Sequence, residues 1–492
     1  MQVLRSSMKA LSQQTAVVFA GKMTGACLGF VMSLLVARWM GPEEFGLFSL
    51  FIVILIFGND VLGDGLSPGV VRFYSMYRRA DPSKAAEVLT NALALRMLLG
   101  IPVVVVGVAI GSQYAAKVFH SQLYVVPVVL GLVGSFGAAL WSFNLSVWQA
   151  REEFGTYGVM VALINVLRVL SLPLLFLGGY LTLGGIMGSH VLVYFLCALS
   201  GTWALRRHLA HVRVNGELLR ELFRFSKWPA MASLCFILQV NLGVPVLNYF
   251  VNAREAGLYG AGSSLLMGVD FLTVSLLTTL LPKVSQLTGI EQCRSYVQRS
   301  FPMYALIAAA ILPLLFFARP VVIGLFGSAY EGTIEVFQVL FVGTLGTLVT
   351  HPLYLVLYTM NRPHLHTLSG IVGLIVWLLA GFWLIPQFGA VGAAWTTLCS
   401  RLVQSLTIVV ILWHALGFGR SSGLAARARA WSSSSWVALR VSPDRLEESE
   451  FRFVSALHAY AHTNKMADLA LLRNQKEWGF LGFYPDFVLW YR

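Results

Sequence analysis

Three arginines stand inside long apolar segments, where an ionised side chain needs a partner or water. They are Arg96, Arg168 and Arg401. Charged residues in such segments usually face a cavity rather than lipid, and the planar guanidinium group can pair with two oxygens of one anion. The three residues therefore predict an interior that binds an anionic group. The alternative is that Arg96 and Arg168 extend toward lipid headgroups from near a helix end.

Neutral polar residues accompany two of these arginines at helical spacing. Asn165 precedes Arg168 by three residues, and Gln404 follows Arg401 by three residues. Residues three apart lie on the same face of a helix, so each pair predicts a polar stripe. We expect these stripes to contact substrate.

Two further amides fall on one helical face. Asn241 and Asn248 are seven residues apart, which is close to two helical turns. Their amide groups could bind sugar hydroxyls, and we include them among the candidate substrate contacts. Hydrogen bonding between helices is the alternative role of such side chains in a membrane.

Acidic residues in apolar segments form a separate candidate group. They are Asp60, Asp64 and Asp270, and Asp270 has no obvious basic neighbour in its own segment. A carboxylate in a membrane can take up a proton or bind sodium as a cavity opens to alternate sides. The three residues therefore predict coupling to an ion. For Asp64, a fixed pair with Arg72 or another arginine is an equally good alternative.

The elements that hold these residues are predicted to be membrane helices. Of the 492 residues, 57% are hydrophobic and 12% are charged, far from the composition of a soluble globular protein. Apolar runs of roughly 20 residues or more recur between short polar breaks, and each can cross a bilayer as a helix. About twelve such runs are predicted, and they cover residues 15–40, 45–68, 88–111, 123–149, 156–178, 183–205, 226–251, 256–282, 300–326, 334–360, 366–386 and 389–416.

A basic loop divides this all-α integral membrane protein into two bundles. We expect an N-terminal six-helix bundle over 1–205, a linker over 206–225 and a C-terminal six-helix bundle over 226–416. The segment 417–492 has no further long apolar run and is predicted to lie outside the membrane. Lys and Arg are concentrated in alternate loops, which predicts that both termini and the linker are cytoplasmic.

An internal repeat relates the two predicted bundles. GPEEFGLFSL at 41–50 aligns with NAREAGLYGA at 252–261, and both segments follow the first helix of a bundle. SVWQAREEF from Ser146 matches LVLYTMNRPH from Leu355, and both segments lie between the fourth and fifth helices of a bundle. Six helices per half is an even number, so the halves share one orientation and are related by an axis along the membrane normal. We expect the bundles to surround a central cavity.

Three motifs resemble those of a known transporter family. They are LLVARWMGPEEFGLFSL, DGLSPGVVRFYS and WQAREEF. In these motifs, and over roughly residues 10–416, the chain resembles the polysaccharide flippases of the multidrug/oligosaccharidyl-lipid/polysaccharide exporter superfamily, the group that includes O-antigen and capsule-unit flippases. The resemblance implies two six-helix bundles around a cavity that opens alternately to each side. It also implies transfer of an undecaprenyl-diphosphate-linked oligosaccharide from the cytoplasmic to the outer leaflet of the inner membrane.

This resemblance gives the candidate residues a common task. The arginines would bind the diphosphate as it crosses the membrane. The expected partners are the lipid-linked oligosaccharide, the bilayer and other proteins of surface polysaccharide or lipopolysaccharide assembly. Related cargoes are the alternative: lipid II, a teichoic-type glycan or a drug.

An enzyme is a weaker alternative. A glycan polymerase or glycosyltransferase would need a convergent catalytic set, and the short outer loops carry no carboxylate cluster beyond Glu43 and Glu44. None of the five cysteines forms a CxxC pair, and no GxxxxGK[ST] motif is present. We therefore expect no metal and no cofactor. We also expect the basic residues to set the orientation of the chain in the membrane rather than to bind nucleic acid.

Overall fold

The computed structural model describes residues 2–78, 80–209, 215–270, 273, 284, 289–360, 363–416, 469–473 and 487–491. The chain divides into two compact units, Met1–Gly419 and Arg420–Arg492. In the second unit the described residues form two antiparallel strands, β1 (Leu469–Arg473) and β2 (Phe487–Tyr491), with Leu471 opposite Leu489. The rest of the segment 417–492 lies outside the described residues.

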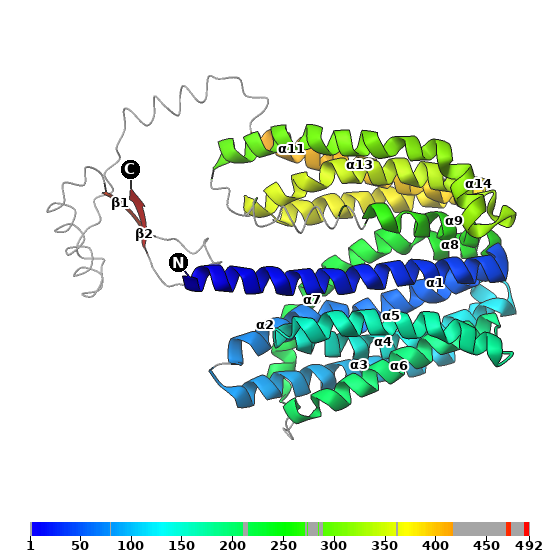
Figure 1. Cartoon of the computed structure of the whole chain (residues 1–492), viewed down its shortest axis with the longest axis horizontal. Coiled ribbons are helices and arrows are strands. Elements are labelled where there is room, and N and C mark those ends of the chain that lie inside the picture. Colours follow the sequence, from blue (N-terminus) through cyan, green and yellow to red (C-terminus); the bar gives the residue numbers. More distant parts are fainter. Residues whose placement is uncertain are drawn as a thin grey trace. The chain divides into compact units, whose positions relative to one another are not determined.

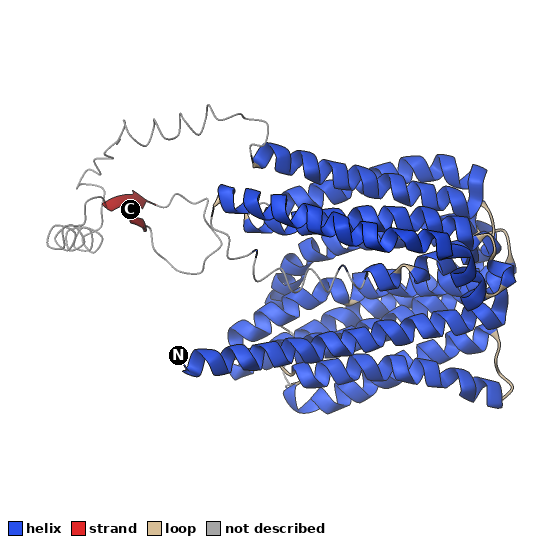
Figure 2. Ribbon diagram, turned by 45° about the horizontal axis from the view of Figure 1, so that its top comes forward, coloured by secondary structure: helices blue, strands red, loops and turns tan. Residues whose placement is uncertain are grey.

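The described part of the first unit is helical throughout (Figure 1, Figure 2). Its first half contains α1 (Gln2–Leu62), α2 (Ser67–Tyr77), α3 (Pro82–Val118), α4 (Val125–Ala150), α5 (Phe154–Leu177) and α6 (Leu183–Leu205), with a 3₁₀ turn, η1 (Asp64–Leu66), between α1 and α2. Its second half contains α7 (Gly216–Asn241), α8 (Gly243–Phe250), α9 (Ala253–Leu265), α11 (Ile290–Ile311), α12 (Ala318–Phe326), α13 (Thr333–Thr359) and α14 (Pro363–Ala415), with η5 (Ser328–Tyr330) before α13.

Side-chain caps explain several helix starts. Asp81 accepts the N–H of Lys84 at the start of α3, and Asn252 accepts the N–H of Glu255 at the start of α9. Such caps satisfy backbone donors that have no partner inside the helix. They place helix boundaries at polar positions between the apolar runs, as the sequence predicts.

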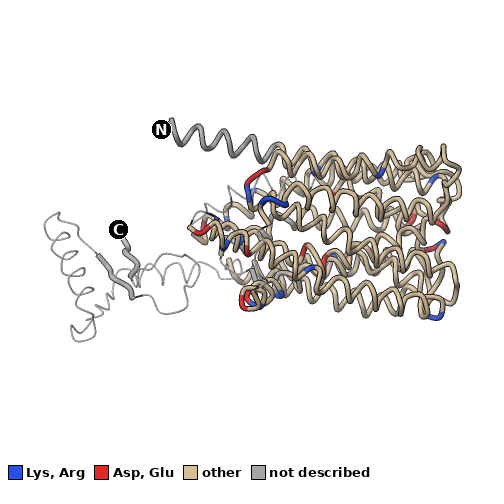
Figure 3. The backbone as a smooth tube through the Cα atoms, turned by 90° about the horizontal axis from the view of Figure 1, so that it is seen from below, with Lys and Arg blue, Asp and Glu red and all other residues tan. Residues whose placement is uncertain are grey.

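The helices are long and apolar enough to cross a membrane. Within the described residues, eight helices meet that criterion, or nine if the bent pair formed by the end of α7 and α8 counts as one span. Charged residues gather mainly near the two ends of the helical unit (Figure 3). The prediction of an all-helical membrane unit is therefore confirmed in this part of the chain.

Glycine breaks divide the two longest helices. Gly41 in α1 has φ 79° and Gly389 in α14 has φ 56°, backbone conformations that favour glycine. The predicted spans 15–40 and 45–68 therefore lie on either side of one break, and 366–386 and 389–416 on either side of the other. The predicted span 256–282 lies outside the described residues at 271–272 and 274–282, so the count of twelve stays a prediction.

Each half of the unit packs mainly on itself. In the first half α4 contacts α1, α3 and α6, and α5 contacts α1; in the second half α13 contacts α14, α11 and α9. These groups form the lower and upper bundles of Figure 1. The exceptions are α1, which contacts α8, α9 and α12 of the second half, and α7, which contacts α2, α3 and η1 of the first half as well as α14 of the second. These two helices therefore join the bundles.

The bundles meet at a reciprocal glycine contact between α1 and α9, which we call the glycine crossing. A Cβ on Gly46 would collide with the backbone carbonyl of Ala253, and a Cβ on Gly257 would collide with the carbonyl of Pro42. Ala253 follows Pro42, and Gly257 follows Gly46, by the same 211 residues. A two-fold relation between the halves produces this kind of exchange. The crossing lies beside the Gly41 break, at what we call the Gly41 end of the unit.

Further contacts hold the Gly41 end together. The Arg38 guanidinium donates to the carbonyl of Gly324 at 3.4 Å, near the C-terminus of α12, where the helix dipole favours a cation. The Tyr330 hydroxyl donates to the carbonyl of Ala37 at 2.8 Å. Both bonds join α1 to elements of the second half. At this end, then, the two bundles are tied by polar contacts as well as by packing.

Candidate functional site

A cavity of about 210 Å³ opens between α1, α5 and α6, and we call it the Arg168 pocket. Its polar lining comes from Asn165, Arg168 and His190, with Ser33 of α1 beside them. Its apolar lining includes Met267, which belongs to the second half of the chain. A volume several times that of one water molecule leaves room for a polar group of a ligand.

Arg168 keeps hydrogen-bonding capacity free within this pocket. Its Nη1 donates to Asn165 Oδ1 in a long bond of 3.4 Å, and its guanidinium lies 4.2 Å from the centre of the Tyr194 ring. The buried Nε has no partner among the described residues, and no described carboxylate pairs with the side chain. An uncompensated arginine with free donors is suited to an anion.

His190 lies next to Arg168, and sequence reasoning did not place it there. It is buried, its Nδ1 donates to the carbonyl of Ile186 at 3.1 Å, and the rings of Phe48 and Phe51 lie edge-on against it. With Nδ1 carrying the proton, Nε2 of the neutral ring is an acceptor. The only sequence signal was a polar residue on the helix after Arg168, which is also common in ordinary helix packing.

The second half builds a neutral counterpart of this arrangement. Tyr259 matches Phe48 in the repeat, and its hydroxyl lies 3.0 Å from Thr397 Oγ1 on α14. Trp377 Nε1 donates to the same oxygen at 3.3 Å, and Trp377 is fully buried. At this place in the second half, neutral hydroxyl and indole groups bond to one another. The arginine of this half, Arg401, lies one turn further along α14 from Thr397.

Arg401 and Gln404 lie in the second half, away from the Arg168 pocket. Both are half-buried on α14, and Arg401 donates to the Thr344 hydroxyl on α13. Nearby, Gln239 of α7 donates to Ser400 Oγ at 2.9 Å. The predicted stripe on this helix therefore exists, but it belongs to a different polar cluster from the one around Arg168.

Arg96 is placed in the protein interior, outside the Arg168 pocket. It is fully buried, and its Nη2 donates to the Gly63 carbonyl at 3.1 Å and to Ser67 Oγ at 3.2 Å. Its guanidinium lies 5.3 Å from the centre of the Phe143 ring. Gly63 and Ser67 flank the η1 turn, where α1 gives way to α2. Arg96 thus satisfies backbone and side-chain acceptors at a helix break.

Replacing Arg96 by alanine is expected to destabilise the fold. The Gly63 carbonyl also accepts the N–H groups of Leu66 and Ser67, so the change removes a hydrogen bond from a charged donor, which contributes about 1.5–3 kcal/mol to the free energy of unfolding. Thermal unfolding of the purified protein in detergent measures the loss. An alanine variant that melts with the wild type would show that the η1 turn does not depend on this side chain.

The three predicted acidic residues fall in different surroundings. Asp60 is buried on α1; one carboxylate oxygen accepts the Ser233 hydroxyl of α7, and the other has no described partner. Asp64 is exposed and accepts Asn59 Nδ2 at 2.8 Å and Ser142 Oγ at 2.5 Å. No described ion pair joins Asp64 to Arg72 or to another arginine, but Asp64 interacts through charge with the buried Arg96.

Asp270 is the last residue of its segment that the structure describes in sequence. Its side chain is exposed, and it interacts through charge with Arg401. Residues 271–272 and 274–283 beyond it are outside the described residues. Asp270 therefore belongs with the polar cluster on α14 and not with the Arg168 pocket.

The predicted asparagines use their amide donors within their own helices. Asn241 donates to the carbonyl of Ile237 at 3.1 Å, and the buried Asn248 donates to the carbonyl of Val244 at 2.9 Å. Neither residue lines the Arg168 pocket. Asn165 makes a similar local bond, to Val161, but also lies in the pocket. The three asparagines therefore do not lie in one pocket.

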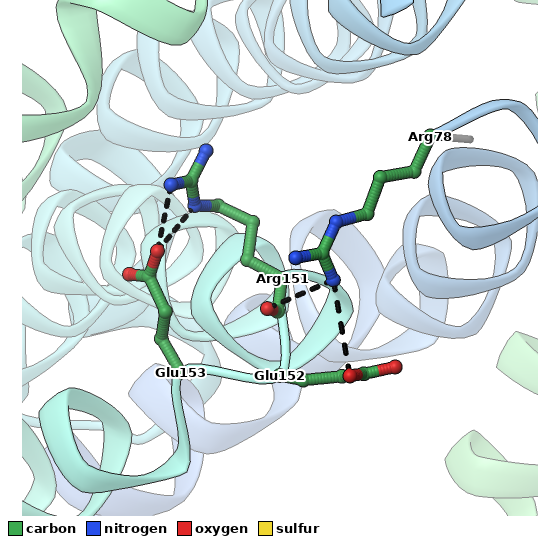
Figure 4. Close-up of polar contacts among 4 residues, drawn as sticks. All are labelled: Arg78, Arg151, Glu152 and Glu153. Atoms are coloured by element: carbon green, nitrogen blue, oxygen red, sulfur yellow. Dashed lines mark hydrogen bonds and ion pairs between the residues drawn. The ribbon is translucent and has the colours of Figure 1, made fainter.

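The WQAREEF motif builds a charged turn at the end opposite Gly41 (Figure 4). Arg151 Nη2 lies 2.7 Å from Glu153 Oε1, and Arg78 Nη1 donates to the Arg151 carbonyl at 3.0 Å. Glu152 takes the left-handed backbone conformation, with φ 62°, and its carboxylate lies 4.0 Å from Arg78. These charges are mutually compensated. The turn joins α2 to the α4–α5 connection and offers no free cation of the kind seen at Arg168.

Comparisons with known proteins agree on family and fold. A family profile described as "Polysaccharide biosynthesis protein" matches residues 11–288. The "Probable low-salt glycan biosynthesis flippase Agl15" of Haloferax volcanii is 22% identical over 82% of this chain and 82% of its own length. The "Succinoglycan biosynthesis transport protein ExoT" of Rhizobium meliloti is 23% identical over 62% of this chain and 60% of its own.

Solved structures with the same fold have low sequence identity to the chain. "Lipid II flippase MurJ, inward closed conformation" matches with a TM-score of 0.69 and 12% identity, covering 91% of this chain and 97% of that one. An inward-facing multidrug resistance MATE family transporter of the MOP superfamily matches with a TM-score of 0.63 and 14% identity, covering 81% and 96%. These likenesses establish the fold.

Proposed function

We propose that the chain, which belongs to the polysaccharide biosynthesis protein family, flips polyprenyl-diphosphate-linked oligosaccharide units across the inner membrane. The family lies within a superfamily of flippases and exporters, and the chain is a transporter rather than an enzyme. The proposed direction is from the cytoplasmic to the outer leaflet. The units would be used in surface polysaccharide biosynthesis, of which O-antigen assembly is one form. The observation that carries this proposal is the uncompensated Arg168 in its pocket.

The depth of the pocket supports a role during the crossing itself. Gly29 lines the pocket and precedes the Gly41 break by 12 residues, a helical rise of roughly 18 Å. The hydrocarbon layer is about 30 Å thick, so the pocket falls near its middle. A diphosphate is least soluble there, and an arginine with free donors would replace part of its lost hydration. The polyprenyl chain needs no such help because it is soluble in lipid.

We assign the remaining polar residues to the same passage. Arg401, Gln404, Asn241 and Asn248 would contact the oligosaccharide from the second half, with Asp270 as an ion-coupling residue beside Arg401. Arg96 would act on substrate indirectly, through the η1 turn against which α7 packs. The uncompensated Arg168 favours the first half for the diphosphate, which leaves the polar cluster of the second half for the sugars.

Alternating access is the mechanism that this geometry supports. We place both termini and the linker in the cytoplasm, so the Gly41 end faces outward. The glycine crossing would close the outer side, and separation of α1 from α9 would open it. On the opposite side α7 would be the moving element, because it contacts both bundles. The membrane potential assists export of an anion by about 2.3 kcal/mol per charge for each 100 mV.

Asp60 is the residue through which an ion could act on α7. Its buried carboxylate accepts the Ser233 hydroxyl of α7, and its second oxygen is free to bind a proton or sodium. We expect Asp60→Asn to lower the flipping rate at least about tenfold, because it keeps an acceptor for Ser233 but removes the charge an ion would neutralise. The rate of the variant should also depend less on a proton or sodium gradient than that of the wild type.

The measurement for Asp60 compares flipping in vesicles with and without each gradient. The matched control is Asp81→Asn, because Asp81 caps α3 outside the apolar segments and asparagine is an equally good cap. Full rate and full gradient dependence in Asp60→Asn would remove this residue from ion coupling.

Deletion of the gene in the native host tests the proposed function. Cells lacking the protein should accumulate one lipid-linked oligosaccharide on the cytoplasmic leaflet and lose the matching surface polysaccharide. Chemical identification of the accumulated lipid would name the cargo. Normal surface polysaccharide with no accumulated intermediate would contradict the proposal.

A further inference from the structure

We infer that Lys22 is the capture residue of the transport path, which binds the diphosphate in the inner-leaflet headgroup layer before it reaches Arg168. This inference rests on the proposed function and adds a second anion contact to it. Binding at Lys22 on α1 would precede binding in the Arg168 pocket.

The helical register puts Lys22 on the face of α1 that lines the pocket. Gly29 and Ser33 line the pocket, and they follow Lys22 by 7 and 11 residues. These separations are close to two and three helical turns, so the three residues lie along one stripe. Lys22 is exposed. Its ammonium group is therefore presented near the seam that leads along α1 to the pocket.

The seam is fixed by close packing between α1 and α5. A Cβ on Gly21 would lie 2.7 Å from the Cα of Gly158, and a Cβ on Gly25 would lie 3.0 Å from Asn165 Nδ2. The two glycines flank Lys22 and hold α1 against the helix that carries Arg168. Because Asn165 itself lines the pocket, the same contact surface runs from the level of Lys22 to the pocket.

The depth of Lys22 matches that of a lipid diphosphate. Lys22 precedes the Gly41 break by 19 residues, a helical rise of roughly 28 Å, which is close to the thickness of the hydrocarbon layer of about 30 Å. Its ammonium group therefore lies at the interface opposite the Gly41 end. A polyprenyl diphosphate in that leaflet has its charge at the same level. From Lys22 to the level of Gly29 the rise is roughly 10 Å, so capture and pocket binding are separate contacts.

The charge of Lys22 is available for a ligand. Among the described residues, none of the four ion pairs includes Lys22. An ordinary interfacial anchor would also sit at this depth. The two roles differ in one respect: an anchor works on any lipid-facing side of the helix, whereas a capture residue must lie on the side of the pocket.

Met23 supplies the control for that difference. It is 42% exposed and adjoins Lys22 in the sequence, so it lies at nearly the same depth but about 100° around the helix. Lys22→Ala removes the ammonium group. The double variant Lys22→Ala/Met23→Lys returns it at the same level on another side. Lys22→Arg keeps both the charge and the side.

The test is the initial flipping rate of the purified full chain in vesicles, measured against the concentration of a polyprenyl-diphosphate oligosaccharide. We expect Lys22→Ala to raise the half-saturating concentration about five- to tenfold, with the maximal rate unchanged, since one basic residue near a charged surface contributes about 1 kcal/mol. Lys22→Arg should stay within about twofold of the wild type. The double variant should resemble Lys22→Ala.

Two results would overturn the inference while leaving the proposed function intact. One is a Lys22→Ala variant with the wild-type concentration dependence. The other is full recovery in the double variant, which would identify Lys22 as an anchor. Failure of the wild-type protein to flip this lipid would instead contradict the proposed function on which the inference rests.

Discussion

Replacement of Arg168 by alanine is expected to abolish flipping of a diphosphate-linked oligosaccharide while leaving the protein folded. The change removes the one cation that lines the described pocket near the middle of the membrane. Hydrogen bonds that involve a charged group contribute about 1.5–3 kcal/mol each. Two such bonds to a diphosphate would therefore lower the rate by at least about hundredfold when lost. The flipping rate of Arg168→Lys should lie between those of the wild type and Arg168→Ala, since lysine keeps the charge but lacks the planar guanidinium group.

Arg319→Ala is the matched control for this prediction. Arg319 is an arginine of the same protein, 70% exposed and paired at 3.0 Å with Glu331, and exposed pairs contribute little. It should flip at the wild-type rate. Size-exclusion and thermal unfolding profiles equal to those of the wild type would show that Arg168→Ala remains folded. A folded Arg168→Ala protein that flips normally would remove the pocket from the mechanism.

Replacement of Gly46 by alanine is expected to disrupt closure at the Gly41 end. The new Cβ would meet the carbonyl of Ala253, a backbone atom that cannot move aside as a side chain can. Overpacking of this kind costs about 1–3 kcal/mol, and here the cost falls on the state in which α1 and α9 are in contact. The equilibrium should shift toward states with the Gly41 end open. Gly257→Ala should behave in the same way because its contact is the reciprocal one.

Labelling of a cysteine at Ala256 measures this shift. Ala256 is fully buried on α9, between Ala253 and Gly257 of the glycine crossing. In a cysteine-free background, an impermeant maleimide should label this cysteine from the outer side several times faster when Gly46 is alanine. Gly188→Ala is the control, because a Cβ there meets nothing within 4 Å. Equal labelling in all three proteins would show that the crossing is not the outer closure.

The elements of the fold could be predicted because they depend on local sequence. Apolar runs fixed most helices, and the polar interruption at Gly41 marked a break that the backbone of that glycine confirms. The alignment of Gly46 with Gly257 predicted two equivalent positions. It could not predict that these positions touch each other, since contact depends on how the halves pack and not on either segment alone.

The candidate site could be predicted only where the chemistry was local. Asn165 and Arg168 share a helix face and do lie together in one pocket. Arg96, like Arg168, is an arginine inside an apolar segment, so the sequence does not distinguish the two. Its N–H groups bond to Gly63 and Ser67, which flank a helix break distant from Arg96 in the sequence. His190 carried no charge to mark it. Its place beside Arg168 follows from the packing of α5 on α6.

Reconstituted flipping is the most direct measurement of the central claim. Purified protein in vesicles would be given a fluorescent polyprenyl-diphosphate oligosaccharide in both leaflets, and a membrane-impermeant quencher would be added outside. The account predicts that wild-type protein exposes the inner-leaflet pool to the quencher, whereas Arg168→Ala vesicles behave like vesicles without protein. Wild-type vesicles that retain the protected pool, or Arg168→Ala vesicles that lose it at the wild-type rate, would contradict the account.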